Sequence, residues 1–251
     1  MILRVPQGYT RLRVGQADAV AHDSTVASVR EALGGGTLYA YAAAHPERRE
    51  LAGRHPAYAI PLPLGGPRVV IRRSHHGGLL APITRDLFLP PTRAPYELLV
   101  SLLLARTGVP TPPVIAYAVY PVGPLLRRSD VATIEIPGDD LSSVLQGAPA
   151  RSSAAQWLAP VSDLLKGLAR AGAWHPDLNL KNILLSNDDA GNPRAFVLDV
   201  DRIRFHPPED PNVRSANFQR LERSIRKWSE QAATALDERL VSQLRALAFA
   251  T

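Results

Sequence analysis

Cysteine is absent from this 251-residue chain, and lysine is scarce: three of the 29 basic residues are lysine, at positions 166, 181 and 227. Without cysteine the protein can form neither a disulfide nor a thiolate metal site. No run of about 18 apolar residues occurs, and the first residues lack the apolar segment of a signal peptide. We therefore expect an intracellular protein without a membrane-spanning helix.

Aromatic residues are also few, at 6% of the chain, which is too sparse for a base-stacking platform. The formal net charge is nevertheless +6, so the composition predicts an anionic partner such as a nucleotide or an acidic surface. Nucleic acid is a weaker alternative because no RNA-recognition module or zinc finger is visible. A hydrophobic content of 45% predicts a globular protein with a sizeable core.

The most informative stretch lies between residues 173 and 202. It holds His175, Asp177 and Asn182 in the pattern HxDxxxxN, followed by Asp199 and Asp201. Phosphoryl transfer needs a carboxylate that orients the attacking hydroxyl and accepts its proton, together with oxygen ligands for magnesium. Asp177 fits the first role, and Asn182 with Asp199 fits the second. A polar loop of an unrelated α+β domain is the alternative.

Two strand-like segments separate these ligands. Residues 183–185 and 195–198 are apolar, and residues 187–193 between them have the composition of a turn. A hairpin here would bring Asn182 and Asp199 together from its two sides. The order of loop, strand, turn, strand and acid is that of the protein-kinase signature.

The first half of the chain offers a candidate phosphate-binding cation. Residues 58–64 and 68–73 predict a hairpin of two strands, and Arg72 stands where the kinase pattern has a lysine. A guanidinium binds phosphate and stays charged, so the exchange is chemically plausible. A solvated arginine on an edge strand is the alternative. Gly53 precedes the hairpin, and its backbone could approach a phosphate, although this signal is weak.

A helix predicted over residues 91–108 carries a candidate partner for that cation. Thr92 is its expected N-cap, and Gly108 its expected end. Glu97 lies in the position of the kinase glutamate that pairs with the strand cation, so Glu97 and Arg72 form a testable pair. The alternative is a surface carboxylate favoured by the helix dipole.

The rest of the chain predicts a division into two lobes. Residues 1–137 form the N-terminal lobe and 138–251 the C-terminal lobe, with Glu135 and Ile136 in a hinge (135–138) where backbone groups would meet adenine. Further elements are expected as strands at 114–122 and 131–136, and as helices at 24–33, 139–146, 152–171, 214–229 and 231–249. The helix at 214–229 presents a basic face that either rests on anionic lipid or is simply solvated.

These residues resemble the lipopolysaccharide-kinase family, and within it the kinases of 3-deoxy-D-manno-octulosonic acid (Kdo). The resemblance covers roughly residues 50–230. It is carried by VIRRSHHGGL at 70–79, Arg85, DLFL at 86–89, ELL at 97–99, GVPTP at 108–112, WHPDLNLKNILL at 174–185, LDVDR at 198–202 and NFQRLERS at 217–224. DVD replaces the DFG of protein kinases, and no APE motif is present, so peptide substrates are disfavoured.

The resemblance implies an α+β, bilobal protein-kinase-like fold, with a small antiparallel β N-lobe and a mainly helical C-lobe. It implies an ATP- and Mg²⁺-dependent kinase that phosphorylates the 4-hydroxyl of Kdo on Kdo-lipid A, at the cytoplasmic face of an inner membrane. Asp177 would then be the base, His175 the structural histidine, Asn182 and Asp199 the metal ligands, and Arg72 with Glu97 the phosphate-binding pair. Alternatives are a phosphotransferase for another small molecule, such as an antibiotic, and a non-catalytic binding module.

Overall fold

The computed structural model describes residues 4–51, 53, 55–75, 86–147, 154–188, 190–231 and 238–250. The chain forms two compact units. The first contains Met1–Ser101 and Pro113–Glu135, and the second contains Leu102–Pro112 and Ile136–Thr251. This division differs from the expected boundary at residue 137 mainly in the segment Leu102–Pro112, which belongs to the second unit.

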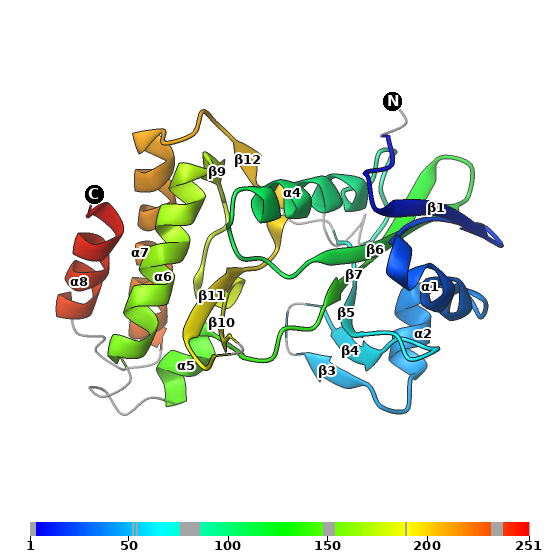
Figure 1. The fold of residues 1–251 in the computed structure, drawn as a ribbon, viewed down its shortest axis with the longest axis horizontal. Coiled ribbons are helices and arrows are strands. Elements are labelled where there is room, and N and C mark those ends of the chain that lie inside the picture. The colour runs from blue at the N-terminus through cyan, green and yellow to red at the C-terminus, as the bar shows by residue number, and fades with distance from the viewer. Residues whose placement is uncertain are drawn as a thin grey trace. The chain divides into compact units, whose positions relative to one another are not determined.

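The first unit is built on a seven-stranded antiparallel sheet, in the order β1-β2-β6-β7-β5-β4-β3 (Figure 1). Its strands are β1 (Tyr9–Val14), β2 (Ala17–His22), β3 (Arg49–Leu51), β4 (Ala57–Pro61), β5 (Arg68–Arg73), β6 (Val114–Val122) and β7 (Leu126–Ile134). The predicted hairpin is confirmed, because β4 pairs with β5 in antiparallel register, Tyr58 opposite Ile71. The hairpin of β1 and β2 was not expected.

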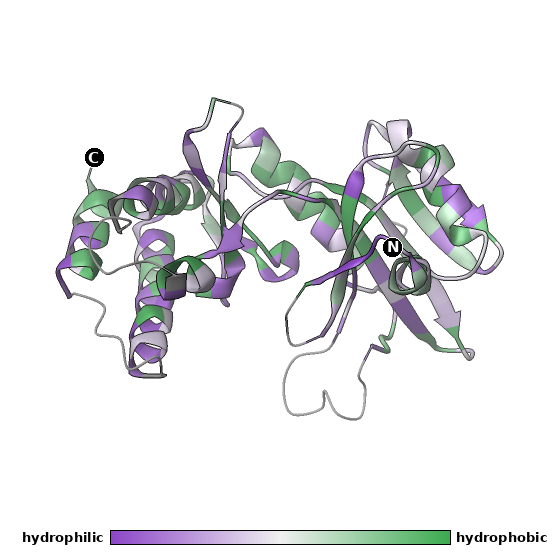
Figure 2. Cartoon of the chain, turned by 90° about the horizontal axis from the view of Figure 1, so that it is seen from below, coloured by the Kyte–Doolittle hydropathy of each residue, from purple (hydrophilic) through white to green (hydrophobic). Residues whose placement is uncertain are grey.

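Helices accompany this sheet: α1 (Val26–Leu33) after the short turn η1 (Asp23–Thr25), then α2 (Leu38–Ala44) and α4 (Ala94–Arg106). Buried residues of α1 and α2, including Val29, Leu33 and Leu38, join those of the strands in one hydrophobic core. Figure 2 shows hydrophobic residues along these strands. The core holds the sheet as a rigid platform for the side chains on β5.

Two helix starts differ from the expectation. Helix α1 begins at Val26 with Thr25 as its N-cap residue, not at residue 24, because the chain first makes the 3-10 turn η1. Helix α4 begins at Ala94, and the buried hydroxyl of Thr92 has no hydrogen-bond partner among the described residues, so Thr92 is not its side-chain cap.

The second unit is mainly helical. Its helices are α5 (Leu141–Gly147), α6 (Ala154–Arg170), α7 (Pro211–Gln231) and α8 (Glu238–Phe249), with the short turns η2 (Leu180–Asn182) and η3 (Val200–Arg202). A three-stranded sheet runs in the order β11-β10-β8, from β8 (Asp139–Asp140), β10 (Ile183–Asn187) and β11 (Pro193–Val197), and a two-stranded ribbon pairs β9 (Ala173–Trp174) with β12 (Arg204–Phe205). No described helix is long and apolar enough to cross a membrane.

Helix α6 is the apolar centre of the second unit. Its apolar stripe is buried throughout, and it comprises Trp157, Leu158, Val161, Leu164, Leu165 and Leu168. Pro160 lies inside the helix. The helix packs on α7, α8 and β11, and it leads directly into β9 and the loop after it. A buried helix therefore sets the position at which the HxDxxxxN segment begins.

Gly172 fixes the ribbon of β9 and β12. Its φ is +64°, and a Cβ there would lie 2.2 Å from the carbonyl oxygen of His206, whose own N–H donates to Gly172 O at 2.8 Å. Only glycine combines the left-handed conformation with so close an approach.

We expect Gly172→Ala to lower the free energy of unfolding well beyond the conformational cost alone. Gly191 is the matched control: its φ is +82° and a Cβ would meet nothing within 4 Å. Gly191→Ala should cost about 1–2 kcal/mol, and Gly172→Ala roughly 1–3 kcal/mol more because the chain must move apart. Denaturant unfolding measures both, and equal costs would contradict this reading of the contact.

Candidate active site

The HxDxxxxN segment is a tight loop between β9 and β10. Leu178 N donates to His175 O at 3.2 Å, and Asn182 N donates to Asn179 O at 3.0 Å, so the loop closes in two consecutive turns. The predicted hairpin follows, with Ile183 opposite Val197. Asp199 comes directly after it, at the start of η3.

The buried imidazole of His175 joins the loop to the Asp199 segment. Its Nδ1 accepts from the N–H of Asp177 at 3.2 Å, and its Nε2 lies 3.0 Å from the carbonyl oxygen of Leu198. A nitrogen that accepts from an amide carries no proton, so the ring is the neutral tautomer with the hydrogen on Nε2. The side chain of His175 thus connects Asp177, the candidate base, with Leu198, which directly precedes the candidate ligand Asp199.

Burial keeps this imidazole neutral. Desolvation lowers the pKa of His175, and it outweighs the Leu198 carbonyl and the carboxylates of Asp199, Asp177 and Asp201, which all act to raise it. The same three carboxylates are therefore close enough to influence the ring. A protonated ring would lose its bond from the Asp177 amide, because Nδ1 could no longer accept.

The amide of Asn182 is oriented by its partner. Its Nδ2 donates to the carbonyl oxygen of Asp177 at 2.9 Å, and its backbone oxygen accepts from Leu198 N at 2.9 Å. The side-chain oxygen is consequently the end of the amide that can act as a ligand. Asp199 adopts a left-handed conformation with φ of +52°, which is uncommon outside glycine and the Asn or Asp side chains.

The side-chain oxygens of Asn182 and Asp199 suit magnesium. An amide oxygen and a carboxylate oxygen are hard ligands of the kind that Mg²⁺ prefers, and this ion usually takes one or two protein groups and completes its shell with water and phosphate oxygens. Asn182 and Asp199 fit that pattern. Among the described residues, no group of three or more His, Cys, Asp or Glu side chains could hold a metal alone.

Helix α7 supports the loop through a residue whose role was not foreseen. The side chain of Asn217 is buried, accepts from His175 N at 2.9 Å and donates to Ala173 O at 2.9 Å. About two helical turns later, Ser224 Oγ accepts from Leu180 N at 3.1 Å. Asn217 stands in the segment 217–224 that resembles the family, but no spacing rule linked it to a loop 42 residues earlier.

In the first unit, Arg72 and Glu97 form the expected pair. Arg72 Nη2 on β5 lies 2.5 Å from Glu97 Oε1 on α4, and the Glu97 side chain is only 2% exposed. The neighbouring Arg73 points to the other face of the sheet, where it pairs with the buried Asp130 at 3.0 Å. Arg72 is therefore not simply a solvated arginine on an edge strand.

At the expected hinge and at Gly53, the backbone offers a nucleotide less than the sequence predicted. The carboxylate of Glu135 pairs with Arg49 at 2.6 Å and Arg68 at 2.7 Å, and its N–H donates to Arg68 O at 3.0 Å, so this N–H does not face a base. These arginines lower the pKa of Glu135 against the opposing effect of burial. Ile136 opens the second unit. Gly53 is exposed, but its φ is not left-handed, and a Cβ would lie 3.2 Å from His55 O.

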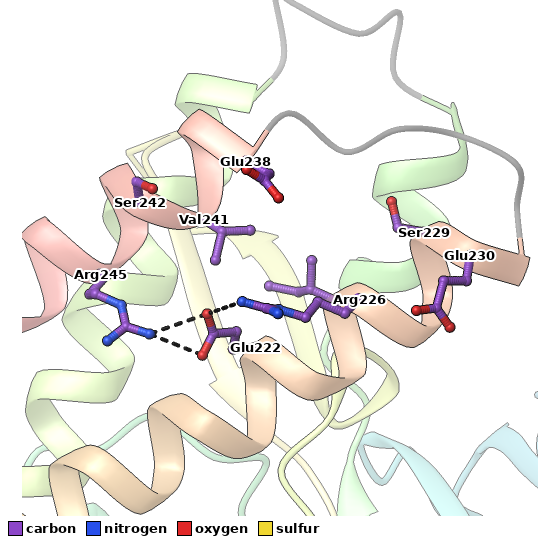
Figure 3. Close-up of a pocket in the computed structure, with 9 residues that line it drawn as sticks. Glu222, Arg226, Ser229, Glu230, Glu238, Val241, Ser242 and Arg245 are labelled. Carbon is purple, nitrogen blue, oxygen red and sulfur yellow. Dashed lines mark hydrogen bonds and ion pairs between the residues drawn. The ribbon is translucent and has the colours of Figure 1, made fainter.

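A polar pocket lies between α7 and α8, and none of the expected site residues lines it (Figure 3). Glu222 at its centre binds Arg226 at 3.1 Å and Arg245 at 3.0 Å. Arg214 likewise pairs with Glu209 at 3.3 Å. Arg214 and Arg226 therefore add less to the basic face of α7 than the sequence predicted, because their charges are offset.

Comparison with known proteins agrees with these features. A family model described as "Lipopolysaccharide kinase (Kdo/WaaP) family" matches residues 63–239. A 3-deoxy-D-manno-octulosonic acid kinase of Vibrio parahaemolyticus is 28% identical over 186 residues, which is 69% of this chain and 74% of that protein. The kinase of the same name from Xanthomonas oryzae pv. oryzae is 31% identical over 183 residues, covering 70% of this chain and 68% of that one.

Among solved structures, the chain is similar to one titled "WaaP in complex with acyl carrier protein". The TM-score is 0.54, the sequence identity is 17%, and the match covers 88% of this chain and 85% of that one. At this identity the likeness concerns the fold alone. The α+β, kinase-like fold expected from the sequence is confirmed, with an antiparallel sheet in the first unit and a mainly helical second unit.

The neutral state of His175 predicts a pH-dependent stability. Because its pKa is lowered on folding, the unfolded chain takes up a proton near pH 6.5 that the native state does not. This contribution to stability is present above about pH 6.5 and is lost as the pH falls.

We expect the free energy of unfolding of the wild type to fall between about pH 7.5 and 5.5 more steeply than that of His175→Gln, by up to about 1.4 kcal/mol per pH unit. His75, whose pKa burial lowers to about 4, contributes to both proteins and cancels in the comparison. Parallel pH profiles in denaturant unfolding would contradict the buried neutral imidazole.

Proposed function

The chain belongs to the lipopolysaccharide kinase (Kdo/WaaP) family, and from this premise we propose that it transfers the terminal phosphoryl group of ATP to the 4-hydroxyl of Kdo in Kdo-lipid A. Membership makes it a phosphotransferase that acts on a hydroxyl group of a lipopolysaccharide sugar. The acceptor and the position of its hydroxyl are the proposed part. The observation that carries the proposal is the imidazole of His175, which joins the Asp177 loop to the Asp199 segment.

In this mechanism Asp177 is the catalytic base. Its carboxylate orients the acceptor hydroxyl and takes its proton as the new oxygen–phosphorus bond forms and ADP leaves. Asn182 Oδ1 and Asp199 would hold Mg²⁺, which, when bound, neutralises charge on the nucleotide phosphates. His175 keeps both segments in place and takes no part in proton transfer, because burial holds it neutral.

We assign the nucleotide side to the first unit. Arg72 would bind the phosphates while Glu97 holds its guanidinium, since the buried carboxylate fixes the direction of the side chain. The backbone near Gly53, and the carbonyl of Glu135 with the backbone of Ile136, would meet the phosphates and the adenine respectively. The ion pairs of Glu135 with Arg49 and Arg68 support this role by fixing the strand end.

Kdo as the acceptor is supported by the relatives. The similar proteins from Vibrio, Xanthomonas and Stenotrophomonas carry the name of this sugar acid, at 28% to 32% identity. Each match covers about 70% of this chain, and the family model, which spans residues 63–239, includes the whole HxDxxxxN loop. An acceptor embedded in a membrane would also explain an anion-binding surface elsewhere on the chain.

Helix α7 offers such a surface, and we propose that it rests on anionic lipid at the cytoplasmic face of the inner membrane. Arg220, Arg223 and Lys227 follow one another at helical spacing and are exposed. None of the three forms an ion pair within the part of the chain that the structure describes. They form the basic stripe of α7, and each such charge near an anionic surface contributes about 1 kcal/mol.

We expect Asp177→Asn to abolish phosphoryl transfer to Kdo-lipid A while folding and ATP binding persist. The loss in kcat should be about 10²- to 10⁴-fold, the usual contribution of a general base. Asp163→Asn on α6, which removes an exposed carboxylate from the same unit, is the control and should keep full activity. An Asp177→Asn enzyme with near wild-type turnover would refute the assignment.

The basic stripe of α7 can be tested by vesicle sedimentation. Replacing Arg220, Arg223 and Lys227 with glutamine should weaken binding to anionic vesicles roughly 100-fold, with little effect on zwitterionic vesicles. The control triple Arg13→Gln, Arg30→Gln and Arg48→Gln removes the same charge from exposed sites of the first unit. Equal weakening by both triples would show a general effect of net charge instead of a lipid-facing helix.

A further inference from the structure

The arginines of this chain divide into two kinds. Most of those described on the sheet are held by carboxylates, as are Arg68 by Glu135, Arg73 by Asp130 and Arg128 by Asp86. Arg202 and Arg204 are exposed, and no ion pair reaches either one within the described residues. Their charge is therefore available to a ligand.

The two side chains come from the segments that carry the candidate catalytic residues. Arg202 ends η3, three residues after Asp199, and Arg204 stands on β12 directly opposite Trp174. Trp174 precedes His175, and the three residues from Trp174 to Asp177 span at most roughly 10 Å. Because Arg204 pairs with Trp174, it stands on the strand that leads directly into the loop of the candidate base.

The ribbon that carries Arg204 is firmly held. Ile203 is fully buried between the two arginines, and His206 N binds Gly172 O at 2.8 Å. The guanidinium carbon of Arg204 lies 5.7 Å from the centre of the Trp174 ring, and the ring of His206 meets the same indole edge-on at 6.0 Å. An arginine placed over an indole loses less conformational freedom when it binds an anion.

The chain position of Arg204 favours the acceptor over the nucleotide. Asn182 and Asp199, the proposed metal ligands, flank the β10–β11 hairpin, whereas Arg204 faces the opposite end of the loop, before Asp177. A guanidinium recognises carboxylates and phosphates through two parallel hydrogen bonds. The acceptor named in the relatives is a sugar acid, which carries a carboxylate.

We propose that Arg202 and Arg204 are the acceptor-binding residues that recognise the carboxylate of the sugar acid and so turn its hydroxyl toward Asp177. This inference rests on the proposed function. It also gives a reason for the exposed arginines on a ribbon that Gly172 and Ile203 hold rigid: a fixed cation selects an anionic sugar and sets which hydroxyl reaches the base.

The test measures kcat/KM for Kdo-lipid A and for the same glycolipid with the sugar carboxylate converted to the carboxamide. We expect the wild type to prefer the carboxylate about 10- to 100-fold. Arg204→Gln and Arg202→Gln should lose activity on the carboxylate acceptor and most of this preference, with little change on the carboxamide. Arg204→Lys should keep part of it, because the charge remains but the fork of donors does not.

Arg194→Gln is the matched control, because Arg194 is also exposed and its guanidinium also lies over an aromatic ring, Phe196 at 5.9 Å. It should behave as the wild type does. A third acceptor, with the lipid phosphates removed, separates the two sources of negative charge. Loss that follows the phosphates instead of the carboxylate would overturn the proposal.

Other outcomes are equally decisive. Arg202→Gln and Arg204→Gln enzymes that keep the full preference for the carboxylate, or that lose activity equally on both acceptors while folding normally, would overturn the inference and leave the proposed function standing. A wild type that consumes ATP with magnesium but phosphorylates none of the three acceptors would overturn the proposed function and the inference with it.

Discussion

A single hydrogen-bonded imidazole is the constraint on which the candidate site depends. His175 accepts from the amide of Asp177 and reaches the carbonyl of Leu198, so the loop and the segment of Asp199 cannot separate without breaking one of these bonds. The ring does this only while neutral, and burial within the second unit keeps it so. Asn182 adds a second link, because its side-chain amide donates to Asp177 O and its backbone carbonyl accepts from Leu198 N. The spacing of HxDxxxxN thus places each of these residues where its hydrogen bonds can close the loop.

Helices of the second unit support that network. Asn217 on α7 satisfies two backbone groups of the strand and loop, and the apolar stripe of α6 fixes where the loop starts. In the first unit, β5 sends consecutive arginines to opposite faces, Arg72 to Glu97 and Arg73 to Asp130. Most of the described arginines on the sheet of the first unit form ion pairs with carboxylates. Arg202, Arg204 and the basic stripe of α7 are exposed and form no ion pair among the described residues, so they can meet an anionic ligand.

The features that depend on local sequence pattern could be predicted from the sequence. The β10–β11 hairpin, the buried stripe of α6 and the pairing of Arg72 with Glu97 followed from periodicity, turn composition and the kinase order of motifs. Sequence reasoning missed features decided by distant contacts. The β1–β2 hairpin is short and mixed in composition, Ala94 at the start of α4 is fully buried, and the N–H of Glu135 donates to a neighbouring strand. Asn217 could not be assigned a role because its partners lie more than 40 residues away.

The central claim is that the bonds of His175 and Asn182 place two oxygen ligands on one divalent cation. A crystal structure with a non-hydrolysable ATP analogue and Mg²⁺ tests it most directly. The account predicts Asn182 Oδ1 and an oxygen of Asp199 on the same ion, at about 2.0–2.1 Å, with His175 still between Asp177 and Leu198. An ion held by other side chains, or an Asn182 amide turned so that its nitrogen faces the metal, would contradict it.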